Sequence, residues 1–355
     1  MHGELEAELA AWKQTERAVL FPTGYAANLG VLAALGGPGT LICSDELNHA
    51  PLIDGARLAR GEVAVYGHLD LDHLSSLLDA RGDRLALVVT DAVFSMDGDM
   101  APVEGLSEAC ARHGALLILD EAHSVLGPEL PVAAGAGRTR AGGPDADVPD
   151  DLQLLRLGTL SKTLGSLGGF VAGAVALHGP ARQQGAPVHL HDGSHSGRLC
   201  RCARSPRRAA LRRGRRARRQ ARALVDRLVP GHPSPIVPVV CGDEARALDA
   251  AAALLDRGML VPAIRPPTVP PGTSRLRVTV SAAHTDAQIG ALVSALEDLF
   301  PTSSCFPTHP RWDRTAHPYR ASDPSQRLRA PTRPRWDRTA HPYRASDPSW
   351  RVIVR

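Results

Sequence analysis

Short apolar runs alternate with helical patterns along the first 173 residues of the chain. The stretches TLICSDELNHAPLIDGARLA and RLALVVTDAVFSMDGDMAPVEGLSEACARHG each begin with an apolar run, continue into a polar loop and end in a helical pattern. The runs LALVV and LLIL are continuously apolar, which is typical of parallel strands buried on both faces. The pattern predicts an α/β fold with a mostly parallel sheet, and it places polar side chains just past the strand ends, where such sheets bind ligands.

The same pattern predicts how the chain divides into domains. Apolar residues at helical spacing in GELEAELAAWKQ predict a first amphipathic helix. Between residues 230 and 300 the pattern reads as strand, helix, strand, strand and helix, which predicts a small C-terminal α/β domain. We place a large domain at 1–225, the small domain at 226–302 and a tail at 303–355.

Two segments depart from this regularity. Residues 174–221 lack apolar periodicity, and twelve arginines lie between Arg198 and Arg222 without any Lys, Asp or Glu. We expect this segment to be poorly ordered. Its composition favours out-of-frame translation of GC-rich DNA over a nucleic-acid-binding arm, because no aromatic residue is interleaved with the arginines and no known binding motif frames them. The tail carries PRWDRTAHPYRASDPS twice, at 310–325 and 334–349, and its composition predicts disorder.

Composition narrows the class of protein further. No apolar run reaches the roughly 20 residues that a membrane-spanning helix needs, and the opening HGELEAELAAW has no signal-peptide pattern. The six cysteines have spacings that fit neither a disulfide framework nor a zinc site. We therefore expect a cytoplasmic protein with a sizeable core, no membrane contact and no metal.

Lysine is rare in this chain, which makes Lys162 informative. The chain contains only Lys13 and Lys162, and the second lies in GTLSKTLGSLGG, between a predicted strand and another apolar stretch. A neutral amine forms a Schiff base with an aldehyde, and an arginine does not. Thr159 and Ser161 offer hydroxyl groups to a phosphate. A solvated loop lysine is the alternative, but its rarity and its glycine-rich loop favour a carbonyl cofactor.

Asp120 and His123 lie in LILDEAH, at the end of a predicted buried strand. A carboxylate at the sheet edge could pair with a protonated ring nitrogen and keep that ring cationic. It could equally be a helix N-cap, since Asp is a good capping residue. The residues alone do not decide between these two interpretations.

Three further positions carry weaker signals. His49 follows a strand in SDELNHAPLID and could stack on a flat cofactor or lie on the surface. Ser95 could donate a hydrogen bond to a cofactor or shape a turn. Gly24 and Tyr25 open a helix, whose free N–H groups favour a phosphate.

Together these stretches resemble the α-oxoamine synthases, a branch of the fold type I enzymes that depend on pyridoxal 5'-phosphate (PLP). The resemblance covers about residues 1–173 and 222–300. It is carried by FPTGYAANLGVL, SDELNHAPLIDG, DAVFSMDGDMAPV, LILDEAHSVLG, GTLSKTLGSLGGFVAG and AIRPPTVPPGTSRLRVTVSAAHT.

The resemblance implies roles for five residues around the PLP ring. Lys162 would bind the PLP aldehyde, Asp120 would pair with the pyridinium nitrogen, and His123 would donate to the phenolic oxygen. His49 would stack on the ring face, and Ser95 would also reach the phenolic oxygen. Lys162, Asp120, His123 and His49 would thus be the catalytic set.

The resemblance also implies phosphate and substrate contacts. Gly24, Tyr25 and Thr159 would contact the PLP phosphate. Arg277 would bind the carboxylate of the amino-acid substrate, and Thr268 would touch substrate. The stretch IRPPTVPPGTSRLR is most similar to the biotin-pathway members of the family.

The implied reaction is a decarboxylative condensation of L-alanine with a pimeloyl thioester, in a homodimer that this chain's departures put in doubt. Glycine-using members of the family, an inactive relic, and a basic binding protein on an old enzyme scaffold are the alternatives. Family members carry a longer segment before HGELEAELAAW, so the resemblance implies an N-terminal truncation. It also implies that DEAHSVLG is shorter than the usual loop of the family and that the segment at 174–221 diverges from it.

Overall fold

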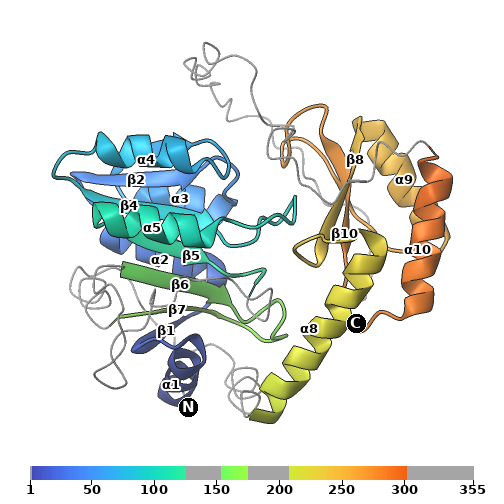
Figure 1. The fold of residues 1–355 in the computed structure, drawn as a ribbon, viewed down its shortest axis with the longest axis horizontal. Helices are drawn as coiled ribbons and strands as arrows, with labels where there is room; N and C mark the ends of the chain where they lie inside the picture. Colours follow the sequence, from blue (N-terminus) through green and yellow to red (C-terminus); the bar gives the residue numbers. More distant parts are fainter. Residues whose placement is uncertain (1, 125–152, 175–207, 302–355) are drawn as a thin grey trace, which may run out of the picture. The chain divides into compact units, whose positions relative to one another are not determined.

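A computed structural model describes residues 2–124, 153–174 and 208–301 of the chain. Figure 1 traces the helices and strands of these ranges along the sequence. The repeated tail and most of the segment 174–221 lie outside the described residues, as does the stretch after DEAHS. The predicted domain boundaries at 225 and 302 stay predictions.

The larger sheet has seven strands in the part of the chain that the structure describes. They are β1 (Arg17–Phe21), β2 (Thr40–Asp45), β3 (Glu62–Tyr66), β4 (Leu85–Asp91), β5 (Leu116–Asp120), β6 (Gln153–Thr159) and β7 (Gly169–Gly173), in the order β1-β7-β6-β5-β4-β2-β3. The strands β3, β2, β4, β5 and β6 pair in parallel, whereas β7 is antiparallel to both β6 and β1. The prediction of an α/β fold with a mostly parallel sheet is confirmed.

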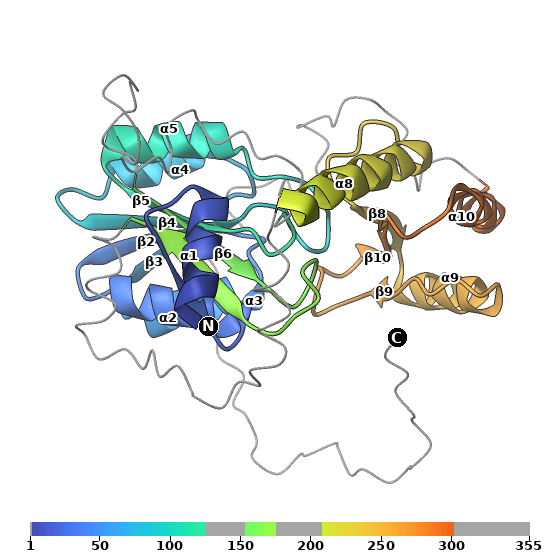
Figure 2. The same ribbon diagram turned by 90° about the horizontal axis from the view of Figure 1, so that it is seen from below.

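Both faces of this sheet are covered by helices. They are α1 (His2–Lys13), α2 (Gly24–Leu35), α3 (Ala50–Leu58), α4 (Leu71–Asp79) and α5 (Val103–His113). Figure 2 shows α4 and α5 on one face and α2 and α3 on the other. Along β2, Leu41 and Cys43 pack in the α4–α5 cluster and Ile42 packs in the α2–α3 cluster. This alternation explains the continuous apolar runs, because successive side chains of a strand point to opposite faces and both faces are buried.

A second sheet lies in the C-terminal part of the described residues. Its strands are β8 (Ile236–Gly242), β9 (Ala263–Ile264) and β10 (Ser274–Thr279), paired antiparallel in the order β8-β10-β9. The helices α8 (Arg208–Leu228), α9 (Glu244–Asp256) and α10 (Asp286–Leu299) accompany it. One apolar cluster joins this sheet to Leu224, Val225 and Leu228 of α8. The strand and helix pattern predicted for residues 230–300 is therefore confirmed.

Two features differ from the sequence-based expectations. We expected poor order throughout 174–221. This expectation is wrong for residues 208–221, because they belong to α8, which begins at Arg208 and continues beyond the segment. Arginine has a high helix propensity, and the last turns of α8 gain stability by burying their apolar residues in the C-terminal core. The strand β3 and the helix α4 were not predicted at all.

No helix within the described ranges is long and apolar enough to cross a membrane.

Candidate active site

The parallel strands bring four loops to one edge of the larger sheet. His49 is the N-cap residue of α3 and follows β2, Asp91 ends β4, and Asp120 ends β5. Lys162 lies in the loop between β6 and β7. Because β2, β4, β5 and β6 run in parallel, their carboxyl ends meet at this edge. In register, Asp91 pairs directly with Asp120.

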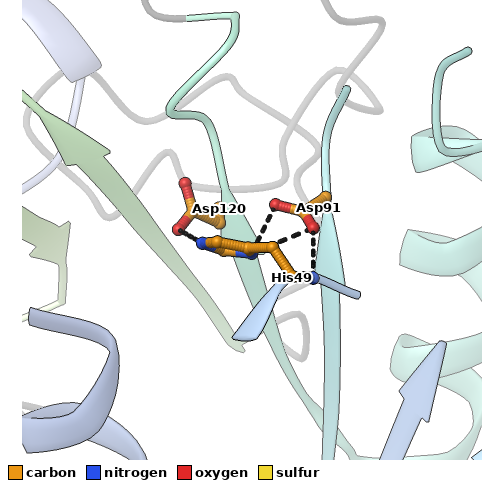
Figure 3. A group of neighbouring side chains, drawn as sticks. All are labelled: His49, Asp91 and Asp120. Atoms are coloured by element: carbon orange, nitrogen blue, oxygen red, sulfur yellow. Dashed lines mark hydrogen bonds and ion pairs between the residues drawn. The ribbon is translucent and has the colours of Figure 1, made fainter. Parts of the chain in front are cut away.

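His49 lies between two carboxylates (Figure 3). Its Nδ1 is 3.0 Å from the Asp91 carboxylate, its Nε2 is 3.4 Å from Asp120 Oδ2, and its backbone N–H donates to Asp91 at 3.0 Å. Burial by itself would lower the pKa of His49, but the hydrogen bond to Asp91 and the charges of Asp91 and Asp120 outweigh it and raise that pKa above its ordinary value. The two carboxylates thus favour the imidazolium form.

Asp120 is buried and is bonded on both carboxylate oxygens. Asn28 Nδ2 of α2 donates to Oδ2 at 2.6 Å, and the Ala122 N–H donates to Oδ1 at 2.7 Å. Burial and the charge of Asp91 raise the pKa of Asp120, while His49, Asn28 and Ala122 act in the opposite direction. The bond from Ala122 is a local turn contact, because no helix begins at residues 121–124, and Oδ2 faces His49. A further cation beside Asp120 would stabilise its ionised form.

Lys162 and His123 contact each other near this group, since the charges of Asp120 and Asp91 act on Lys162. Lys162 Nζ is 3.0 Å from His123 Nε2. Burial lowers the pKa of Lys162, and Arg277 lowers it further, against the charges of Asp120 and Asp91. Burial, followed by the charges of Lys162, Arg277 and His49, lowers the pKa of His123 to about 3. His123 is therefore neutral, and its Nε2 can accept a hydrogen bond from Lys162.

The N-terminus of α2 lies against the end of β6. A Cβ on Gly24 would be 3.1 Å from Thr159 Cβ, so this approach is close. Thr159 Oγ1 is 2.7 Å from Ser161 Oγ. The Tyr25 side chain is exposed, and its hydroxyl donates to Asp54 at 2.8 Å, so a phosphate contact by Tyr25 would use its backbone N–H.

Arg277 reaches the loop that follows β4. Its Nε donates to the carbonyl oxygen of Ser95, and its charge acts on both Lys162 and His123. Thr268 is exposed, and its backbone N–H donates to Arg265. The structure therefore joins Ser95 and Arg277 to the group, and the role of Thr268 stays a prediction.

The sequence interpretation missed Asp91 and Asn28. Asp91 ends a strand next to Asp120, and the same argument that drew attention to Asp120 applies to it. Asn28 is only 1% exposed although it lies in a mostly apolar helix, and its Oδ1 is buried without a hydrogen-bond partner among the described residues. A polar residue on the buried face of a predicted helix was the available signal.

Comparison with known proteins decides the family. The family model for aminotransferase class I and II matches residues 1–296. The chain belongs to the aminotransferase class I and II family. An 8-amino-7-oxononanoate synthase from Anaeromyxobacter dehalogenans is 46% identical over 310 residues, which cover 84% of this chain and 76% of that protein. One from Mycolicibacterium smegmatis is 41% identical over 316 residues, which cover 85% and 78%.

Solved structures of the family agree with this assignment. A serine palmitoyltransferase from Sphingomonas wittichii superposes with a TM-score of 0.74 at 29% identity, over 84% of this chain and 76% of that one. An 8-amino-7-oxononanoate synthase from Francisella tularensis has a TM-score of 0.63 at 23% identity, over 84% and 85%, and shows the shared fold. A variant of serine palmitoyltransferase from S. paucimobilis carries a bound PLP–myriocin aldimine, and it superposes with a TM-score of 0.72 at 29% identity over 84% of this chain and 76% of that one. The present chain is therefore a PLP-dependent enzyme.

The residues at the sheet edge fit PLP. Lys162 offers an amine with a lowered pKa, and Asp120 offers a buried carboxylate whose ionised form lacks sufficient compensation. Gly24 leaves the N-terminus of α2 open beside the Thr159 hydroxyl. One ligand atom from each of His49, Asp91 and Asp120 lies within 4.8 Å of the others, a spacing that a metal ion could also use. Lys162 and the family assignment favour PLP, because a metal ion would not account for the amine.

Proposed function

We propose that this chain forms 8-amino-7-oxononanoate by condensing L-alanine with a pimeloyl thioester, with release of the thiol and of CO2. The observation that carries this proposal is the 46% identity, over 84% of the chain, to a protein of that name. The cluster at the sheet edge supports it, because it contains the amine, the buried acid and the imidazoles that such chemistry uses. When bound, PLP supplies an electron sink for the carbanion that forms at Cα of the amino acid.

Lys162 has two tasks in this proposal. Its Nζ would hold the cofactor through the aldehyde group and would take the Cα proton of alanine. Both tasks require a neutral amine, and the lowered pKa of Lys162 favours that form. His123 accepts a hydrogen bond from Nζ without adding positive charge, since its own pKa is about 3. His123 thereby orients the amine.

Asp120 and His49 hold the ring in the proposed site. Asp120 would hold the ring nitrogen and keep it protonated. Burial and the charge of Asp91 raise the pKa of Asp120, and a cationic ring nitrogen beside it would favour its ionised form. Asn28 fixes Oδ2 of Asp120 from α2. The imidazole face of His49 would hold the flat ring, and Asp91 fixes the orientation of His49 through Nδ1 and the backbone N–H.

Arg277 is the proposed carboxylate site for alanine. Its Nε is already bonded to Ser95, which leaves the terminal guanidinium nitrogens to form a paired contact with a carboxylate. The charge of Arg277 acts on Lys162 and His123, so a bound carboxylate would lie next to the reacting amine. Thr268, the phosphate contacts of Gly24, Tyr25 and Thr159, the homodimer and the cytoplasmic location stay predictions.

A release assay with the purified protein tests the proposal. We expect PLP-loaded protein to release CoA from pimeloyl-CoA fastest with L-alanine, and Lys162→Ala to release none. Faster release with glycine or serine would favour a related condensation, such as those of 2-amino-3-ketobutyrate CoA ligase, 5-aminolevulinate synthase or serine palmitoyltransferase. A protein that binds PLP but releases CoA with none of these amino acids would be an inactive relative, and the proposal would be wrong.

A further inference from the structure

Lys13, the second lysine of the chain, lies in a buried ionic group that the proposed chemistry does not use. This group, here called the Lys13 triad, consists of Lys13, Glu121 and Arg156. Lys13 Nζ pairs with Glu121 Oε2, and Arg156 Nε donates to Glu121 Oε1 at 2.7 Å. The Lys13 residue is 6% exposed and the Glu121 residue 0%. The Arg156 side chain is 19% exposed, so it is partly buried. Burying the charges of Lys13 and Glu121 is costly unless each is paired, and the triad pairs both of them.

The triad connects three elements of the larger sheet. Lys13 is the last residue of α1, Glu121 directly follows β5, and Arg156 lies in β6. Arg156 Nη1 also donates to the Lys13 carbonyl oxygen at 3.4 Å, and the Glu121 N–H donates to Leu157 of β6 at 2.8 Å. The Lys13 ammonium further lies 4.7 Å from the ring centroid of Trp12. Glu121 is thus held by both its side chain and its backbone.

Glu121 lies between two residues of the candidate site, Asp120 and His123. Asp120 precedes it, and His123, which contacts Lys162, follows two residues later. Asp120 Oδ1 accepts from the N–H of Ala122, and Ser124 N–H donates to the Glu121 carbonyl at 2.9 Å. The short stretch from Asp120 to Ser124 is therefore a chain of local bonds, and Glu121 is the member anchored to neighbouring elements.

We propose that the Lys13 triad is a positioning device that fixes the stretch Asp120–Ser124, and through it the Asp120 carboxylate and the His123 imidazole that face the cofactor. This inference rests on the proposed function. The Glu121 side chain points toward Lys13 and Arg156, and away from the side where Asp120 contacts His49, because successive side chains at the end of a strand alternate in direction. Lys13 and Arg156 act through Glu121 and touch neither cofactor nor substrate.

The charges of the triad predict an order of PLP affinity among its variants. Lys13→Met leaves Glu121 paired with Arg156, so it should lower PLP affinity only slightly. Glu121→Gln leaves two cations side by side without their anion, which is the costlier arrangement. The double variant Lys13→Met/Glu121→Gln removes one of those cations, so it should recover part of the PLP affinity that Glu121→Gln loses. A mere loss of packing would make the double variant worse than either single one.

The experiment measures PLP affinity of the apoprotein by equilibrium dialysis, together with thermal unfolding. We expect Glu121→Gln to weaken PLP binding by about tenfold or more, equivalent to about 1.4 kcal/mol. Lys13→Met should weaken it less, and the double variant should bind more tightly than Glu121→Gln. Leu9→Ala, on the buried face of the same helix α1, is the matched control. It should lower the melting temperature and leave PLP affinity within about twofold.

Two patterns would overturn the inference. One is a Glu121→Gln protein that binds PLP as tightly as Leu9→Ala, and the other is a double variant weaker than Glu121→Gln. Should Glu121→Gln fail to fold, tighter PLP binding by the folded double variant than by Lys13→Met would also contradict the predicted order. No PLP uptake by the wild type would overturn the proposed function together with this inference, whereas normal uptake with the wrong variant order overturns the inference alone.

Discussion

Replacing His68 by leucine tests how much the buried ion pairs of His68 with Asp45 and Asp99 stabilise the protein. His68 Nδ1 is 2.8 Å from Asp45 Oδ1 and Nε2 is 2.7 Å from Asp99 Oδ2, with the imidazole side chain only 2% exposed. Asp45 ends β2, and Asp99 belongs to the loop that also carries Ser95. His68 therefore ties the site loop after β4 to the neighbouring strand.

The expected loss of stability follows from these two bonds. A hydrogen bond to a charged group contributes about 1.5–3 kcal/mol, and breaking a buried ion pair costs about 3–5 kcal/mol. Asp45 keeps the N–H groups of Leu47 and Leu69 as donors after the substitution. We therefore expect His68→Leu to lower the free energy of unfolding by about 3–4 kcal/mol near neutral pH.

The same loss should depend on pH with a definite sign. Burial by itself would lower the pKa of His68, but the hydrogen bonds and charges of Asp45 and Asp99 raise it to about 10 from 6.5. A group with a raised folded-state pKa stabilises fully below its unfolded pKa and loses this contribution as the pH rises through the folded pKa. The difference between wild type and His68→Leu should be largest below about pH 6.5 and should shrink toward pH 10.

Urea unfolding of the apoprotein, followed by circular dichroism at about pH 6, 8 and 10, measures this difference. His113→Leu is the control, because His113 Nδ1 lies 3.7 Å from an Asp79 carboxylate whose side chain is 74% exposed. Such a surface pair contributes about 1 kcal/mol or less. A His68→Leu loss that is no larger than the control, or that grows as the pH rises, would refute the reasoning.

Three other predictions address the site and its supports. Gly98→Ala should destabilise the protein by about 3 kcal/mol or more in thermal unfolding, because Gly98 has a φ of +72° and its Cβ would lie 1.8 Å from the Ile236 carbonyl oxygen. Asp91→Asn should lower the pKa of the His49 imidazole in an NMR titration, since Asp91 supplies the hydrogen bond that raises it, and an unchanged titration would contradict this. Arg277→Lys should raise the KM for alanine by about tenfold or more through loss of a paired contact, and unaltered KM would remove Arg277 from the substrate site.

Much of the fold could be predicted because the strands are buried on both faces. The run that ends at Asp120 is apolar at every position, and its end is marked by a charged residue. The edge strand β3 gives a weaker signal, because Val63 and Val65 are 40% and 56% exposed and their burial does not alternate clearly. The helix α8 was misjudged for a different reason. Its arginine-rich first turns have no apolar periodicity, and the apolar residues that anchor the helix come only after residue 221.

The site could be predicted only where a residue type carries chemistry. Lys162 was conspicuous because lysine is rare, and Asp120 because it ends a buried strand. Their supports were not visible in the same way. Glu121 pairs with Lys13 across 108 positions of sequence, and Arg275 pairs with Asp97 across 178. Such long-range pairings depend on strand order and on the approach of distant loops, which neither periodicity nor spacing specifies.

The central claim is that one amine of this chain captures the PLP aldehyde. Because the chain has only Lys13 and Lys162, borohydride reduction of the PLP-treated protein, followed by peptide mass mapping, tests it directly. We predict that a single phosphopyridoxyl group is found on the peptide that contains Lys162 and that Lys162→Ala takes up none. A label on Lys13 or on the N-terminal amine, or no label at all, would contradict the account.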